Sequence, residues 1–238
     1  MTASLLAPAL VTLAFAAVAY ALKGVSLSGA IAGAIVCFTL YVSAGMGAFV
    51  ALVSVFVLTW LATRFGYSRK QQLGTAEQSH GRNALQVLAN LGVASVFAAL
   101  FASDHNPIYV LAMCGALAEA AADTVSSELG QACATRARLI TNFESVPAGT
   151  DGGITLIGTL AGLGAAGIVT LICVGMHLIP LRLAAVALLA AFVGTLADSL
   201  LGAVLERRGY LNNDMVNFSS TAVTAGFTVL LARLGAAV

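Results

Sequence analysis

The sequence predicts an all-α integral membrane protein, a polytopic bundle of about eight transmembrane helices in a single domain over 1–238. Two observations carry this prediction. The 238-residue chain is 60% hydrophobic and only 9% charged, with a mean hydropathy of +0.97, whereas a soluble domain carries roughly 25% charged residues. Its apolar residues also form long unbroken runs, which are typical of transmembrane helices rather than of the alternating strands of a barrel.

Hydropathy places eight expected spans along the chain. In order they cover about Ser4–Leu22, Leu27–Val42, Met46–Leu61, Ala84–Ala102, Ile108–Gly130, Ile154–Gly175, Leu183–Leu205 and Met215–Leu231. The second and third spans are short, so tilted or partly re-entrant segments are alternatives to full crossings there.

The basic residues give these spans an orientation. If the N-terminus lies outside, nine of the eleven Lys and Arg residues fall in loops on the inner side, and such loops face the cytoplasm. We therefore expect a protein of the cell inner membrane or an equivalent membrane, with its active site facing the cytoplasm. The basic residues are scattered and the net charge is only +1, so nucleic acid is not an expected partner.

One internal similarity raises the alternative of two parallel four-helix halves, 1–102 and 108–238. The segment GVSLSGAIAG at 24–33 resembles GITLIGTLAG at 153–162. If the repeat is real, Gly29 and Gly33, and likewise Gly158 and Gly162, would form faces where helices pack closely.

Polar side chains enter the expected spans near their cytoplasmic ends. They are Asn83, Gln86 and Asn90 in the fourth span, Glu119, Asp123, Ser127 and Glu128 in the fifth, Asp198 in the seventh, and Asn213 and Asn217 at the start of the eighth. A lone Asn or Ser there is explained by hydrogen bonding between helices. A carboxylate is not, because it costs about 2.5–3.5 kcal/mol inside a bilayer.

No Lys or Arg is expected deep in a span beside Asp123 or Asp198, so these acids are either protonated or bound to a cation. Carboxylate, amide and hydroxyl oxygens are hard ligands that suit Mg²⁺. The sequence therefore predicts a polar, metal-binding cleft that opens toward the cytoplasm.

The loop before the sixth span is the second candidate element, with the sequence PAGTDGGITLIGTLAG at 147–162. Glycines let a ligand approach the backbone closely, and a helix that starts just after them would point unpaired N–H groups at phosphate. Candidate phosphate-binding residues are Gly149, Thr150, Asp151, Gly152 and Gly153, and Asp151 is also a candidate metal ligand. The alternative is a flexible turn before a membrane helix.

Taken together, the blocks GRNALQVLANLG, ADTVSSELG, PAGTDGGITLIGTLAG, ADSLLGA and LNNDMVNFSS resemble the successive blocks of one membrane family. That family includes phytyl-phosphate kinase of plants and cyanobacteria and animal transmembrane protein 19. The resemblance covers most of 81–224. It implies transfer of a phosphoryl group, preferably from CTP, to an isoprenoid monophosphate.

Each site role follows from this resemblance together with the residue chemistry. Arg82, Asn83, Asp123 and Asp198 are the expected catalytic residues, and Asp123, Asp198 and Asp151 the expected Mg²⁺ ligands. The expected nucleotide and phosphate contacts are Asn90, Gln86, Ser127, Glu128, Gly149, Thr150, Asp151, Gly152, Gly153, Asn213 and Asn217. Lys70, Arg136 and Arg138 are expected to add positive charge nearby.

The expected partners are CTP or another nucleoside triphosphate, an isoprenoid monophosphate and membrane lipids, with a homodimer as one alternative for the oligomeric state. Two other functions fit the same residues. A nucleotidyltransferase that forms a CDP-lipid would use the same acids, metal and CTP. A cation-coupled transporter would explain buried acids in parallel halves, although the polar residues cluster on one side of the membrane rather than at its midplane.

Overall fold

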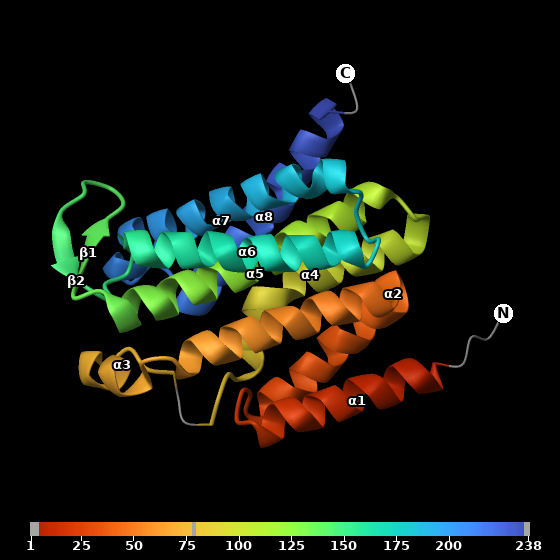
Figure 1. Ribbon diagram of the computed structural model, residues 1–238, viewed down its shortest axis with the longest axis horizontal. Helices are drawn as coiled ribbons and strands as arrows, with labels where there is room; N and C mark the ends of the chain where they lie inside the picture. The colour runs from red at the N-terminus through yellow and green to blue at the C-terminus, as the bar shows by residue number, and fades with distance from the viewer. Residues whose placement is uncertain (1–4, 78–79, 236–238) are drawn as a thin grey trace.

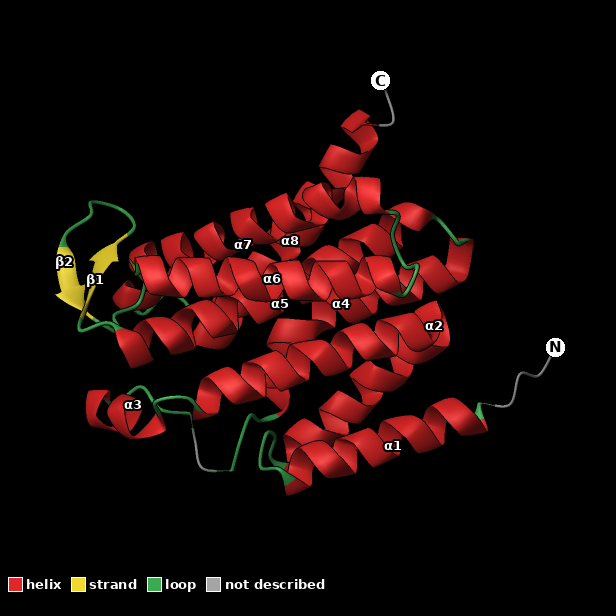
Figure 2. Ribbon diagram, viewed as in Figure 1, coloured by secondary structure: helices red, strands yellow, loops and turns green. Residues whose placement is uncertain are grey.

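The computed structural model describes residues 5–77 and 80–235, and the described chain is mainly helical (Figures 1 and 2). Its helices are α1 (Leu6–Ala21), α2 (Leu27–Arg64), α3 (Tyr67–Leu73), α4 (Ala84–Asp104), α5 (Pro107–Cys133), α6 (Leu156–Gly175), α7 (Ala184–Val204) and α8 (Asn213–Gly235). All except α1 and α3 are long and apolar enough to cross a membrane. The predicted all-α membrane bundle is confirmed; Ser4, where the first span was expected to begin, lies outside the described residues.

The expected second and third spans are the two arms of α2. The arms meet at Gly45, whose φ of 80° and ψ of −171° break the helix and are open essentially to glycine alone. Hydrogen bonds from the Arg64 guanidinium and the Trp60 indole to the Leu22 carbonyl bring the end of the second arm back beside the start of the first. At 1.5 Å per residue each arm is about 27 Å long, close to the thickness of a bilayer core.

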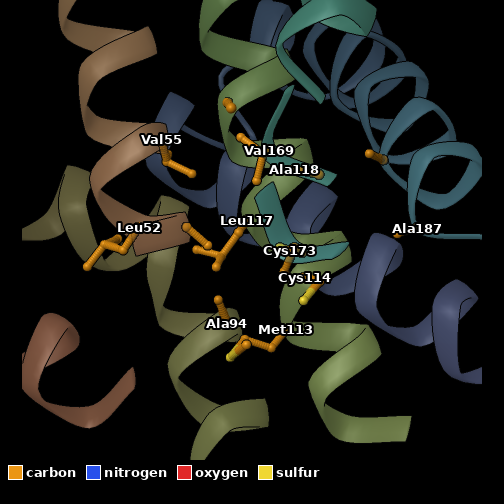
Figure 3. Packing of buried hydrophobic residues seen from close by; sticks show 14 of the residues in the cluster. Leu52, Val55, Ala94, Met113, Cys114, Leu117, Ala118, Val169, Cys173 and Ala187 are labelled. Carbon is orange, nitrogen blue, oxygen red and sulfur yellow. The ribbon is translucent and has the colours of Figure 1, made fainter. Parts of the chain in front are cut away.

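Helix α5 forms the centre of the bundle, and α2, α4, α6, α7 and α8 all pack against it. Asn106 caps its start by accepting a hydrogen bond from the Ile108 N–H, with Pro107 at the first helical position. Every residue from Val110 to Ala122 is buried. Figure 3 shows Met113, Cys114, Leu117 and Ala118 of α5 among Leu52 and Val55 of α2, Ala94 of α4, Val169 and Cys173 of α6 and Ala187 of α7.

Glycines allow α6 to lie directly on α5. A Cβ at Gly158 would lie 2.5 Å from the Ser126 carbonyl oxygen, and one at Gly162 would lie 2.7 Å from that of Ala122. These two positions therefore form the close-packing face that the sequence predicts. Gly33 does not, because a Cβ there would meet no atom within 4 Å.

One end of the bundle collects the polar connections (Figure 1). Helix α3 lies at this end, and so does a small antiparallel sheet of β1 (Arg136–Leu139), β2 (Ser145–Pro147) and β3 (Gly153–Ile154), in the order β2-β1-β3. The start of α1 and the end of α8 lie toward the opposite end. The polar end also carries the loops that hold most basic residues, which is the arrangement expected from their distribution along the sequence.

A buried ion pair joins α3 to α5 at this end. Lys70 has an exposed fraction of 0% and pairs with Glu128, and its ammonium also donates to the carbonyls of Ala62 (3.1 Å) and Thr63 (2.7 Å). The Thr63 hydroxyl donates to the other oxygen of Glu128 over 2.9 Å. The expectation that Lys70 supplies charge to a ligand is therefore wrong, since its charge is used inside the fold.

Replacing Lys70 with Met should lower the free energy of unfolding by about 3–5 kcal/mol, because Glu128 would stay buried without its cation. Denaturant titration in mixed micelles measures the loss. Adding Glu128→Gln should recover part of it, since the unpaired charge is then removed.

Lys23→Met is the matched control, because Lys23 lies at the same end of the bundle and is exposed; it should change stability by no more than about 0.5 kcal/mol. A Lys70→Met variant as stable as this control would contradict a structural role for the ion pair.

Candidate functional site

Three carboxyl groups meet between α5 and α7 near the polar end of the bundle. Asp123 and Asp198 lie within hydrogen-bonding reach of each other, and both interact electrostatically with Glu119. Glu119 has an exposed fraction of 1%, whereas the two aspartates are half-buried. Among the described residues, the Glu119 Oε1 and Asp198 Oδ2 atoms are buried without a hydrogen-bond partner. Buried oxygens of this kind need either a proton or a cation.

The acidic cluster extends outward to the surface. Glu206, just beyond α7, interacts electrostatically with Asp123 and Asp198 and also with Asp151 in the glycine-rich loop. Partial desolvation raises the pKa of Asp151, although its side chain is exposed, and the positive charge of Arg207 opposes that effect. All three expected metal ligands therefore belong to one continuous row of acidic side chains, which runs from the bundle interior to the glycine-rich loop.

The geometry limits how a metal ion could be held. Among the described residues, no group of three or more His, Cys, Asp and Glu side chains is arranged to bind a metal. A pair of carboxylates is nevertheless a common protein contribution to a Mg²⁺ site, where substrate phosphates and water complete the octahedron. Asp123 and Asp198 fit this role, with the buried Asp198 Oδ2 atom as the oxygen that lacks a partner.

Arg82 connects the acids to the start of α4. Its guanidinium donates to the Thr124 hydroxyl over 3.2 Å, lies 3.9 Å from the Glu77 carboxylate, and is close enough to Asp123 for their charges to attract. Its backbone is fixed as well. The Arg82 carbonyl accepts from the Ser26 N–H, and the Arg82 N–H donates to the Gly24 carbonyl. Gly29 permits this approach, since a Cβ there would lie 2.1 Å from the Arg82 carbonyl oxygen.

The three predicted amides at the start of α4 make different contacts. Asn83 is the N-cap of α4, and it forms a capping box in which the Gln86 side chain accepts from the Asn83 N–H. Gln86 also donates to Glu77, and the buried Asn90 donates to the Gln86 carbonyl. Asn83 therefore fixes the helix start that carries Arg82, while Gln86 and Asn90 line the cavity beside it.

That cavity has a volume of about 430 Å³ and lies between α1, both arms of α2, α4 and Ala120 of α5. This volume falls within the range of small-molecule sites. Most of the wall is apolar, and its polar residues gather at the end where Lys23, Arg64 and Arg82 lie. Ala120 is one helical turn from Asp123, so the cavity and the acids flank the same stretch of α5.

The glycine-rich loop differs from its expected form. No helix begins directly after the glycines; Gly153–Ile154 form β3, and α6 begins at Leu156 with Thr155 as its cap. The N–H groups of Thr150 and Gly153 already donate within the loop, to the carbonyls of Pro147 and Thr150.

The two glycines of this loop with positive φ are packed against other segments. Gly152 has a φ of +73°, and a Cβ there would lie 2.3 Å from the Ala203 Cβ on α7. Gly149 has a φ of +89° and faces Thr75. A phosphate cradle at 149–153 stays a prediction, and it depends on the remaining N–H groups of the loop.

The remaining predicted nucleotide and phosphate contacts lie in different surroundings. Asn217 lies one helical turn before Ser220, which packs beside Glu119, and therefore on the same side of α8. Glu128 is engaged by Lys70 and Thr63. The exposed Ser127 donates to the Thr124 carbonyl, and Asn213 is exposed at the first position of α8.

Two features of the site were missed by the sequence analysis. Glu206 follows Asp198 by eight residues, a spacing that repeats one face of a helix, but its place in a polar run pointed to a loop. Lys23 and Arg64 were counted only for topology, because nothing local shows that the ends of α1 and α2 meet at a cavity.

A family model described as integral membrane protein DUF92 matches residues 10–225. The chain belongs to this family. An uncharacterized membrane protein of Methanocaldococcus jannaschii is 37% identical over 204 residues, which cover 85% of this chain and 84% of that protein. Protein VTE6, chloroplastic, of Arabidopsis thaliana is 30% identical over 87% of this chain and 65% of its own length.

Protein PGR of Arabidopsis thaliana is 32% identical over 80% of this chain and 75% of its own length. No solved structure matches the chain. Membership in the family confirms the resemblance that the sequence blocks indicate.

Replacing Asp198 with Asn should raise the melting temperature of the metal-free protein by about 2–4 °C, the shift that 1 kcal/mol produces in a chain of this size. The change keeps the side-chain volume and removes one carboxyl from a cluster of three whose charged forms repel one another and are poorly solvated. Thermal melting followed by circular dichroism, in detergent with a chelator, measures the shift.

Asp104→Asn is the control, because Asp104 is exposed at the end of α4; it should leave the melting temperature nearly unchanged. A fall of several degrees for Asp198→Asn would show that the Asp198 carboxylate stabilises the fold.

Proposed function

We propose that this protein is a membrane-embedded phosphotransferase that moves the terminal phosphoryl group of CTP onto an isoprenoid monophosphate. The observation that carries the proposal is the arrangement around Arg82. Arg82 lines an apolar cavity, and its guanidinium is close enough to the Asp123 carboxylate for their charges to attract, while Asp123 lies within hydrogen-bonding reach of Asp198. A lipid phosphate at Arg82 would therefore be next to the acids.

The reaction requires little covalent chemistry from the protein itself. An oxygen of the acceptor phosphate attacks the γ-phosphorus of CTP, the bond from that phosphorus to the β–γ bridging oxygen breaks, and CDP leaves. The acceptor is already anionic, so no strong general base is required. Catalysis then depends on bringing two anions together and neutralising their charge.

The family resemblance supports the choice of substrates, and the geometry supports the roles. Arg82 would bind the acceptor phosphate, and its hydrogen bond to Thr124 holds the guanidinium against α5. Asn83 would act by fixing the start of α4, and Gln86 and Asn90 by lining the approach to Arg82. Asn217 would contact phosphate from α8.

Asp123 and Asp198 would hold Mg²⁺, with Glu119 behind them and Asp151 toward the loop. When bound, the ion would offset the negative charge of the nucleotide phosphates. The two carboxylates suit this task because they are close together and an Asp198 oxygen lacks a partner among the described residues.

We further infer that the polar end of the bundle faces the cytoplasm. Lys23, Arg64, Arg82, the β1 arginines and Arg207 all lie in segments at that end, and the positive-inside rule places such segments on the cytoplasmic side. A cytoplasmic nucleotide would reach the acids directly from there.

Purified protein incubated with an isoprenoid monophosphate and CTP labelled separately at the α- and γ-phosphates tests the reaction. We expect the γ label in an isoprenoid diphosphate and the α label in CDP. Asp123→Asn should lower the rate by at least about 100-fold, the scale for losing one group that stabilises charge in the transition state.

Asp104→Asn should keep the parent rate, because Asp104 lies at the end of α4 remote from the acids. Appearance of the α label in the lipid, with release of pyrophosphate, would overturn the kinase assignment in favour of a nucleotidyltransferase.

A further inference from the structure

The cavity between α1, α2 and α4 is longer than a phosphate site requires. Along the second arm of α2 its wall runs from Arg64 back to Leu52, a distance of about 18 Å at 1.5 Å per residue. Phe15, Val55 and Phe56 line the space between these levels. Such a space suits a long apolar group rather than a compact polar one.

Charge is concentrated at one end of this space. Lys23, Arg64 and Arg82 lie there with one carboxylate, that of Glu77. The Arg64 guanidinium stacks over the Trp60 ring at 4.5 Å and donates to the Leu22 carbonyl, which fixes it at the junction of α1 and α2. The cavity thus offers positive charge at its mouth and hydrocarbon at its depth.

We propose that this cavity binds a single-chain lipid phosphate, with the chain inside and the phosphate between Lys23, Arg64 and Arg82. The assignment rests on the proposed function for the identity of the lipid, an isoprenoid monophosphate, and it locates the whole substrate. The volume of about 430 Å³ lies toward the lower end of the range for small-molecule sites, which suits one chain.

The absence of a side chain at Gly33 leaves space for the hydrocarbon chain of the lipid. It lines the cavity one helical turn beyond Gly29, which packs on the Arg82 carbonyl, and a Cβ at Gly33 would meet nothing within 4 Å. A larger side chain at Gly33 therefore projects into the cavity without displacing the helices. Gly33→Leu is accordingly a substitution that fills the site and leaves the fold intact.

Trp60 provides a direct signal of occupancy, because it is the only tryptophan in the chain and lines the cavity near its mouth. Bromine quenches tryptophan fluorescence on contact. We would titrate the protein, in nanodiscs of unbrominated lipid, with dodecyl phosphate brominated near its headgroup. The matching brominated alcohol tests the contribution of the phosphate charge.

Saturable quenching by the phosphate is expected, with weaker binding of the alcohol. Gly33→Leu should weaken the phosphate's binding about tenfold, the factor lost with roughly two methylene contacts. The matched control is Gly167→Leu in α6, where a Cβ also meets nothing within 4 Å but which does not line the cavity; it should bind as the parent does.

Three results would each overturn the assignment: quenching that does not saturate, equal binding of the alcohol and the phosphate, or equal binding by both glycine variants. The measurement needs no turnover, so it is separate from the test of the proposed function. Normal binding without phosphoryl transfer would contradict the kinase alone. Transfer to a long-chain substrate that is unaffected by Gly33→Leu would contradict the location of the chain alone.

Discussion

The rest of the structure is organised around α5, a helix enclosed by five others that nevertheless carries Glu119, Asp123 and Glu128. Burying a carboxylate in such a place costs free energy. The protein accommodates these carboxylates in two ways. Glu128 pairs with Lys70 and accepts a hydrogen bond from the Thr63 hydroxyl, and it thereby becomes a structural link. Glu119 and Asp123 instead face another acid, Asp198. Arg82 is near enough to offset part of the charge of Asp123, but carboxyl groups gathered in this way are the kind of arrangement found at functional sites.

Arg82 lies between the acidic cluster and the largely apolar cavity. Its position depends on small residues far away in the sequence. Gly81 has a φ of +76°, and a Cβ there would lie 2.5 Å from the Gly24 backbone. Gly29 likewise has no side chain where the Arg82 carbonyl packs against it. The connection between α1 and α2 and the start of α4 therefore form one rigid unit, which holds the Arg82 guanidinium between the cavity and the Asp123 carboxylate.

The sequence predicted the fold class, both arms of α2 and the meeting of Asp123 with Asp198, because long apolar runs and charged residues inside them are strong local signals. Other features depend on contacts between distant segments. Lys70 lies in the polar run SRKQQ and resembles a loop residue until α3 folds onto α5. The three short strands exist only through their pairing. Gly152 was expected to meet a ligand, but its open face is against Ala203. The cavity is formed by four segments and has no motif of its own.

We propose that the paired aspartates bind a divalent metal ion, and Mn²⁺ is a paramagnetic substitute for Mg²⁺ with which this can be measured. Electron paramagnetic resonance of the purified protein with CDP would count the bound ions. We expect about one tightly bound Mn²⁺ per chain, since carboxylates and phosphate together complete its coordination. Asp123→Asn and Asp198→Asn should each remove it, while Asp104→Asn should keep it. Undiminished Mn²⁺ binding in both aspartate variants, or none in the parent protein, would contradict the claim.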